Sequence, residues 1–268
     1  MKFYKNNHIM LYCGITIIII TVFSIIWILL NKNSTPQITQ NYTIKPVTQQ
    51  NNRIPKIVHL IWIGKKQRPN TLTSWTINFV KSYPNWKVKI WDDNDIEKLN
   101  LVNIKYYNKI SEMCGKADIA RYEILYRYGG MYIDADTIWL GKNLNNNLFT
   151  GLLNMSYEKK KLIMNGWFSV VKLHPFFKLV IDEIPYRNLN DPPWISVGPT
   201  LITDVYKKYK KDSFGINFVP IELVLCPTDW HGIKNDKYKY ILNKCEKSDA
   251  LAFHWGFSTN NNVITNSS

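Results

Sequence analysis

The sequence predicts an α/β fold, because buried strand patterns alternate with helix patterns along it. Residues 57–63 form an almost unbroken apolar run ended by Gly64, which is typical of a buried parallel strand. Residues 71–83 predict a helix with four apolar side chains on one face: Leu72, Trp75, Phe79 and Val80. Residues 86–91 predict the second strand, so the order is strand, helix, strand.

The second strand is followed by the acidic sequence Asp92-Asp93-Asn94-Asp95, which admits two interpretations. It resembles a metal-binding loop, but Asp is also a favoured residue at the start of a helix. We favour the second interpretation, in which Asp92 or Asp93 caps a helix over residues 95–100.

The N-terminal region predicts a membrane anchor. Residues 9–30 contain no charged side chain and are long enough to span a bilayer, whereas a buried core helix fits their terminal position less well. More lysines precede the span than follow it closely, so residues 1–8 should be cytoplasmic. Residues 31–53 are rich in Asn, Gln and Thr, which predicts a flexible stem. We therefore expect a single-pass type II membrane protein with a folded domain, residues 54–268, in the Golgi or ER lumen.

The net charge and the motifs indicate which classes of partner the protein binds. The net charge of +14 indicates solvated basic faces that also attract anionic lipid or phosphorylated ligands. No Gly-rich phosphate loop or nucleic-acid module is present, so we expect no nucleic-acid partner.

The four cysteines leave two possibilities. Beyond Cys13 in the apolar span, either Cys226 and Cys245 form a disulfide, or these two and Cys114 are free buried thiols.

The most informative stretch is residues 116–140, KADIARYEILYRYGGMYIDADTIWL. Its first half has helical apolar spacing stopped by two glycines, and Met131-Tyr132-Ile133 predicts a short strand. Asp134 and Asp136 follow that strand, where both carboxylates can turn towards one point. Carboxylate oxygens suit Mn²⁺ or Mg²⁺, although an isolated Asp-x-Asp is also common in solvated turns.

The same helix carries an acid and a base one turn apart. Asp118 and Arg121 are at positions i and i+3, so they project from one face. Such a pair is often a surface ion pair that contributes little. Next to two clustered carboxylates, the pair instead places one acid and one base beside a candidate metal site.

The whole pattern resembles the signature of the sugar-transferring glycosyltransferases of family 32. The matching residues are Asp118, Arg121, Tyr122, Leu125, Tyr126, Tyr128, Gly129, Gly130, Tyr132, Asp134 and Asp136. The resemblance covers roughly residues 54–258. It implies a GT-A type nucleotide-diphospho-sugar transferase fold, in which helices flank a mixed, mainly parallel sheet.

The resemblance also implies an activity. We expect a retaining, metal-dependent hexosyltransferase that uses Mn²⁺ (or Mg²⁺) and a nucleotide-diphosphate sugar, with a glycan or glycolipid as acceptor. GDP-mannose and several UDP-hexoses all occur as donors around the family. The compact domain resembles the mannosyltransferases more, so mannose is favoured. A eukaryote or a virus of one would be the expected source.

Site residues are carried over by the same resemblance. The metal ligands would be Asp134, Asp136 and His254; the catalytic residues Asp134, Asp136 and Asn165; and the donor-binding residues Ile61, Trp62, Asp118, Arg121, Tyr132 and Asp134. From the residues alone, other roles also fit: His254 could be a core histidine, Asn165 could form a turn, and Trp62 could pack in the core. The Gly198-Pro199 turn would lie on the acceptor side, and His174-Pro175 should be structural.

The sequence departs from the family pattern at one place, and two alternative functions are considered. The Gly-Ser-Trp that usually follows the C-terminal histidine is replaced by Gly256-Phe257-Ser258, which puts the lid over the donor in doubt. A catalytically degenerate, membrane-anchored glycan-binding protein would fit that departure. A phosphatase with an aspartyl-phosphate would need the motif on the first strand, and Thr or Val where Ile138 stands.

Overall fold

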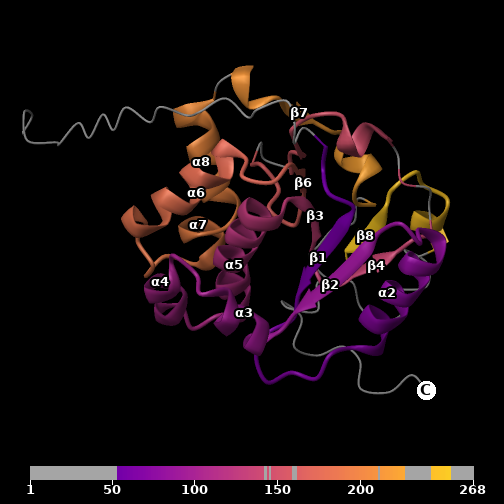
Figure 1. Cartoon of the computed structure of the whole chain (residues 1–268), viewed down its shortest axis with the longest axis horizontal. Coiled ribbons are helices and arrows are strands. Elements are labelled where there is room, and N and C mark those ends of the chain that lie inside the picture. The colour runs from indigo at the N-terminus through magenta and orange to yellow at the C-terminus, as the bar shows by residue number, and fades with distance from the viewer. Residues whose placement is uncertain are drawn as a thin grey trace, which may run out of the picture. The chain divides into compact units, whose positions relative to one another are not determined.

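The computed structural model describes residues 53–141, 144, 146–158, 162–210, 212–226 and 243–254 (Figure 1). The predicted tail, membrane span and nearly all of the stem lie outside these residues, as do residues 256–258. Within the described residues, no helix has both the length and the apolar character needed to cross a membrane.

The centre of the fold is a six-stranded sheet in the order β2-β1-β3-β6-β5-β7. Strand β1 is parallel to β2 and β3, and β5 is parallel to β7, whereas β6 is antiparallel to β3 and β5. The prediction of an α/β fold with a mixed, mostly parallel sheet is confirmed. The strands are β1 (Ile57–Ile61), β2 (Lys87–Trp91), β3 (Gly130–Ile133), β5 (Leu153–Met155), β6 (Trp167–Val170) and β7 (Ile216–Phe218).

Helices cover both faces of this sheet. Figure 1 shows α5 to α8 on one side, and α2 with the small β4–β8 sheet on the other. The helices are α2 (Asn70–Ser82), α3 (Asp93–Leu99), α4 (Ile104–Lys109), α5 (Met113–Tyr128), α6 (Pro175–Glu183), α7 (Pro193–Ser196) and α8 (Pro199–Tyr209). Short 3₁₀ turns are η2 (Asn146–Phe149), η3 (Ile184–Tyr186), η4 (Asp212–Phe214) and η5 (Ile221–Leu223), and the small sheet pairs β4 (Thr137–Trp139) with β8 (Ala252–His254).

Helix α2 packs an aromatic face against strand β4 of the small sheet. Phe79 stacks on Trp75 and meets the ring of Trp139 edge-on, with centroid distances of 5.3 and 5.0 Å. Val80 was expected on the same buried face, but its side chain is 41% exposed. It follows Phe79 by one residue, which turns it about 100° away from the core.

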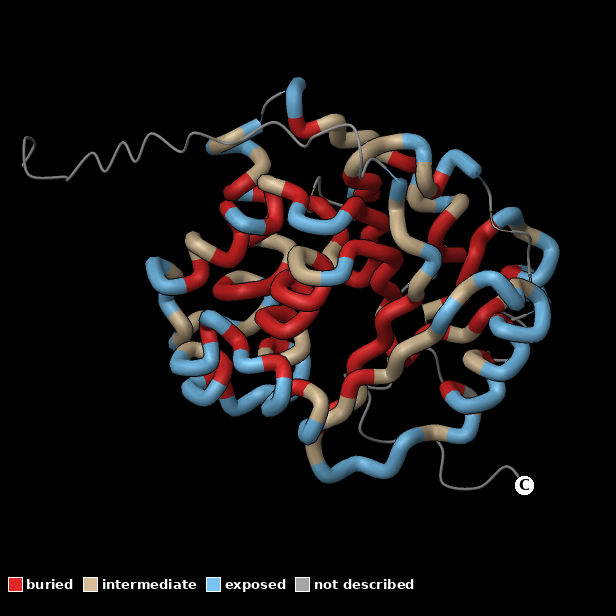
Figure 2. The backbone as a smooth tube through the Cα atoms, in the orientation of Figure 1, coloured by how far each residue is buried: buried red, intermediate tan, exposed pale blue. Residues whose placement is uncertain are grey.

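Helix α5 is buried over most of its length, as the red coils near the centre of Figure 2 show. It begins at Met113, three residues before the predicted stretch, and ends where the glycines predict. Gly129 has a φ of +63°, and a Cβ there would lie 2.6 Å from the backbone N of Lys172. Gly130, with a φ of +98°, allows β3 the same close approach to Ile57. The paired glycines therefore let β3 enter the sheet directly after the helix.

The predicted cap at Asp92 is confirmed, and a second cap is formed by His174. Asp92 accepts a hydrogen bond from the backbone N of Asp95 (2.9 Å) in a capping box, so the acidic sequence starts α3. The helix spans residues 93–99 where 95–100 were expected. His174 caps α6 through Nδ1, and its Nε2 donates to the carbonyl of Phe214 at 2.7 Å. His174 is therefore structural, as expected.

A disulfide joins Cys226 to Cys245, while Cys114 is a free, exposed cysteine. The structure thus selects one of the two options for the cysteines. The backbone N of Cys226 also donates to the carbonyl of Ala252 at 2.9 Å. Both links hold the segment that carries β8, and with it His254, against the domain.

Candidate functional site

Asp134 and Asp136 lie just beyond the C-terminal end of β3, which runs parallel to β1 and antiparallel to β6. Ligands commonly bind beyond the carboxyl ends of parallel strands in such sheets. The turn is held by the backbone N of Asp134, which donates to Gly166 O at 3.0 Å, and by Thr137 Oγ1, which donates to Asp134 O at 2.7 Å. Ala135 is buried between the two acids, so the turn is anchored in the core.

His254 joins these carboxylates from the other end of the chain. Its Nε2 lies 2.9 Å from Asp136 Oδ1 and 3.7 Å from Asp134 Oδ2, and the three donor atoms lie within 4.8 Å of one another. Two carboxylate oxygens and one imidazole nitrogen fit a divalent cation such as Mn²⁺. The structure brings all three predicted ligands together, although spacing in the sequence does not require it.

The imidazole of His254 balances the charge of the cluster. Burial opposes its protonation, but the carboxylates of Asp136 and Asp134 outweigh burial and raise the pKa of His254 to about 10. In the metal-free protein at neutral pH, the ring is therefore in its protonated, positively charged form. A cation that binds here takes the place of that positive charge.

Arg121 connects the cluster to helix α5. Its guanidinium lies 2.8 Å from Asp118 Oδ1 and 3.1 Å from Asp134 Oδ1, and its side chain is only 5% exposed. It also covers the ring of Tyr132 at 4.5 Å and donates to the carbonyl of Asn165. Tyr132 OH in turn donates to Asp134 Oδ1 at 2.8 Å. The predicted pair is thus a buried network that orients Asp134, and not a surface ion pair.

Asp118 is held from two further sides. Asn165 Nδ2 donates to its Oδ1 at 2.9 Å, and a Cβ on Gly198 would lie 3.2 Å from its Oδ2. Burial raises the pKa of Asp118 to about 7, with Arg121 and Asn165 acting in the opposite direction. Asn165 is therefore more than a turn residue, because its side chain and its carbonyl bind the acid and the base of the pair.

Ile61 and Trp62, which were predicted to bind the donor, lie at the end of the neighbouring strand β1. Ile61 is buried at the end of β1, and Trp62 is half-buried, with Nε1 donating to Lys66 O at 2.9 Å. They share the edge of the sheet with the carboxylates because β1 and β3 are parallel. Within the residues that the structure describes, no hydrogen bond or ion pair joins them to the cluster, so their role is not fixed by direct contact.

Glu158 is an acid near the site that the sequence did not reveal. Its backbone N donates to Leu162 O at 2.7 Å, in a hairpin where Tyr157 bridges Ile163. Burial raises the pKa of Glu158, Asp134 adds to the increase, and His254 opposes it, so the carboxyl is an electrostatic neighbour of both residues. Glu158 precedes a run of lysines, which in the sequence indicates only a solvated face.

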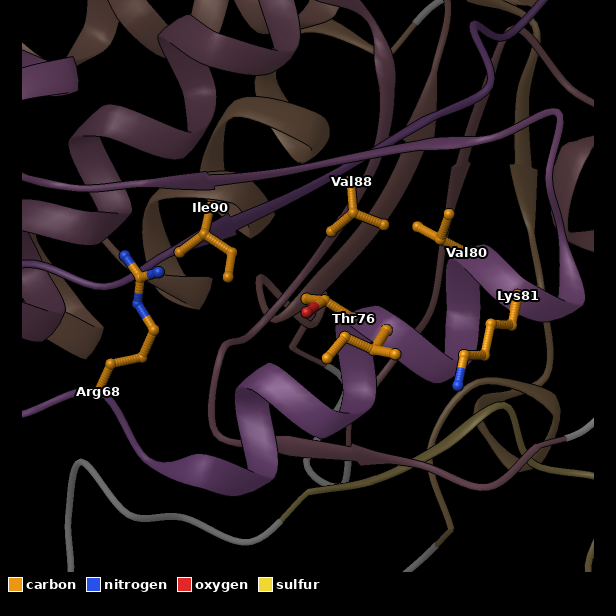
Figure 3. A pocket seen from close by; sticks show the side chains of 7 residues that line it. Arg68, Thr76, Val80, Lys81, Val88 and Ile90 are labelled. Carbon is orange, nitrogen blue, oxygen red and sulfur yellow. The ribbon is translucent and has the colours of Figure 1, made fainter.

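A separate groove lies between α2 and the edge strand β2 (Figure 3). It is open, with a volume of about 580 Å³, and its lining is apolar and basic: Arg68, Thr76, Ile77, Val80, Lys81, Val88 and Ile90. None of the predicted site residues lines it, and the lining lacks a carboxylate. The groove is therefore distinct from the cluster at the end of β3.

Comparison with known proteins identifies the family. Residues 69–151 match the family described as "Glycosyltransferase sugar-binding region containing DXD motif". The chain is 31% identical to "Uncharacterized glycosyltransferase L373" of Acanthamoeba polyphaga mimivirus over 171 residues, which are 60% of this chain and 67% of that protein.

Two groups of cellular proteins are also similar. Inositol phosphoceramide mannosyltransferase 3 of Schizosaccharomyces pombe is 24% identical over 63% of this chain and 49% of its own length. Lactosylceramide 4-alpha-galactosyltransferase of Rattus norvegicus is 35% identical over 35% of this chain and 24% of its own length. This chain thus spans about half of the yeast relative and less of the rat relative. It belongs to the family of glycosyltransferases whose sugar-binding region contains a DXD motif.

Proposed function

We propose that this protein is a metal-dependent, retaining glycosyltransferase that moves a hexose from a nucleotide-diphosphate sugar to a glycan or glycolipid. The observation that carries the proposal is the contact between two parts of one site. The cluster of Asp134, Asp136 and His254 suits a divalent cation with its diphosphate. The buried pair of Arg121 and Asp118, which touches this cluster, suits the polar groups of a sugar.

In this proposal each described side chain has a role. Asp136, His254 and Asp134 hold the cation, which when bound neutralises charge on the departing diphosphate. Tyr132 and Arg121 fix the rotamer of Asp134 through their contacts with Oδ1. Asp118 and the amide of Asn165 bind sugar hydroxyls.

Other residues complete the donor site. Ile61 and Trp62, at the neighbouring strand end, would border the nucleotide. Glu158, an electrostatic neighbour of Asp134 and His254, would accept a hydrogen bond from a substrate hydroxyl. The resemblance to family 32 supports retention, in which the acceptor attacks the face that the diphosphate leaves.

Mannose is the favoured sugar and a glycolipid the favoured acceptor. The fission yeast relatives are named as inositol phosphoceramide mannosyltransferases, and the rat relative as a lactosylceramide galactosyltransferase. Both names denote ceramide lipids, while the sugars differ, so GDP-mannose and UDP-galactose are the first donors to compare. The anchor at residues 9–30, the lumenal location and the GT-A type of the fold are part of the same proposal.

Nucleotide release tests the proposal. The full chain in detergent is incubated with GDP-mannose, UDP-galactose, UDP-glucose or UDP-N-acetylglucosamine, with Mn²⁺ or with EDTA. We expect selective release from one donor that requires Mn²⁺ and is lost in Asp136→Asn. Asp182→Asn, which changes a carboxylate on α6, is the matched control. Neither binding nor release of any donor by the folded chain would favour a glycan-binding protein without turnover.

A further inference from the structure

Helix α7 carries an exposed tryptophan beside the buried donor site. Trp194 is 55% exposed, and within the described residues its indole makes no ring contact or hydrogen bond. Tryptophan is enriched at binding surfaces, because its indole offers a large apolar face together with one N–H donor. The question is which ligand covers this ring.

Two glycines bring α7 against the first half of α5. A Cβ on Gly115 would lie 3.0 Å from Pro193 Cβ. A Cβ on Gly198 would lie 2.8 Å from Trp194 Cα and 3.2 Å from Asp118 Oδ2. Gly198 therefore lies between the backbone of Trp194 and the carboxylate of Asp118, and its lack of a side chain lets the two approach.

The element that presents Trp194 is fixed from both ends. Arg187 donates to the carbonyls of Ile195 (2.8 Å) and Ser196 (3.1 Å), and Tyr122 OH donates to Val197 O at 2.7 Å. Pro193 at the start of α7 restricts the backbone further. Since the backbone is held before a ligand arrives, little backbone conformational entropy is lost when the indole is covered.

The order of the contacts identifies the ligand. From the metal cluster outward, Asp134 touches Arg121, Arg121 touches Asp118, and Gly198 separates Asp118 from Trp194. A donor with its diphosphate at the cluster has its sugar beside Arg121 and Asp118, so the next ring outward belongs to the acceptor. We propose that Trp194 forms an acceptor subsite, in which the indole stacks on the C–H face of a hexopyranose ring. This assignment of the ligand rests on the proposed function.

The test uses the full chain in a detergent without a sugar headgroup, as Trp194→Ala and Trp194→Phe. Leu173→Ala is the matched control, because Leu173 is 54% exposed and lies at the other end of α5, where its N–H bonds to Tyr126 O. Donor hydrolysis without acceptor and transfer to methyl hexopyranosides are measured separately. Ligand-observed NMR with methyl α-mannopyranoside and methyl β-galactopyranoside measures binding without turnover.

We expect Trp194→Ala to raise KM for the acceptor about tenfold, equivalent to about 1.4 kcal/mol, while donor hydrolysis is unchanged. Trp194→Phe and Leu173→Ala should keep KM within about threefold of the parent, since each leaves a stacking ring. Equal KM in Trp194→Ala, or no binding of either glycoside by the parent chain, would overturn the subsite. Glycoside binding that depends on Trp194 in a chain that neither binds nor hydrolyses any donor would reject the proposed function and retain a hexose-binding subsite at Trp194.

Discussion

Nε2 of His254 lies 2.9 Å from Oδ1 of Asp136, although the two residues come from distant parts of the chain. The contact is produced by the small sheet, in which β4 pairs with β8 so that Thr137 is opposite His254. The residue before Thr137 is Asp136, so the pairing brings the imidazole to the end of the Asp-x-Asp turn. The third donor of the cluster is thus supplied by strand register.

Replacing His254 should weaken cation binding without unfolding the protein. In His254→Ala we expect Mn²⁺ affinity to fall at least about tenfold, because even the loss of an outer-shell partner of a metal ligand costs that much. Calorimetric titration of the full chain with Mn²⁺ measures the change, and Asp182→Asn on α6 is the control. Unchanged affinity in His254→Ala would remove this residue from the metal site.

Cation binding should release a proton and strengthen as the pH rises. Despite burial, Asp136 and Asp134 raise the pKa of His254 to about 10, so near pH 7 the ring is protonated and must lose its proton to become a ligand. Below that pKa, we expect Mn²⁺ affinity to increase by about tenfold per pH unit. Calorimetry in two buffers of different ionisation enthalpy counts the protons. Release of none near pH 7 would contradict the protonated state.

Local features of the site could be predicted from the sequence, and its tertiary assembly could not. The helix, the paired glycines and the strand before Asp134 follow from spacing and backbone requirements, and the structure confirms them. His254 was predicted by resemblance, because the sequence of a three-residue strand does not indicate which strand it pairs with. Glu158 was missed for a similar reason, since its burial depends on a hairpin and on distant neighbours. Val80 shows the same limit, because periodicity alone did not give the width of the buried face of α2.

Gly166 should be required for the position of Asp134. A Cβ at this residue would lie 2.6 Å from Asp134 Oδ2, the oxygen of Asp134 that lies 3.7 Å from His254 Nε2. In Gly166→Ala the carboxylate has to turn away, so we expect weaker Mn²⁺ binding and slower donor hydrolysis with little loss of stability. Titration and thermal unfolding, compared with Asp134→Asn, separate these effects. Normal Mn²⁺ affinity in Gly166→Ala would show that Oδ2 is not a ligand.

Removing Arg121 should cost stability as well as activity. Its guanidinium is buried between Asp118 and Asp134, so Arg121→Ala leaves two carboxylates without their common counter-charge. We expect the free energy of unfolding to fall by about 3–5 kcal/mol, the range for breaking a buried ion pair. Urea denaturation measures this change. Lys208→Ala, which removes an exposed partner of Glu183, should change stability by less than about 1 kcal/mol.

We expect Glu158 to contribute to sugar transfer and to lower the stability of the folded state. Along its extended segment, Ser156 and Glu158 share one face, and Met164, paired with Ser156, packs in the same core cluster as Ala135 and Ala252. That face therefore borders the same core cluster as the Asp-x-Asp turn and the strand that carries His254. Burial and Asp134 raise the pKa of Glu158, so its ionised form destabilises the folded state above the unfolded-state pKa.

Glu158→Gln should therefore stabilise the folded chain at pH 8 while it slows sugar transfer. Loss of one charged hydrogen bond to a substrate hydroxyl predicts about a tenfold to hundredfold fall in kcat/KM. Thermal unfolding and transfer rates are compared with those of Glu97→Gln, an exposed position on α3 that should change neither. A stabilised Glu158→Gln with full transfer activity would mean that this carboxylate lies near the cluster without touching the substrate.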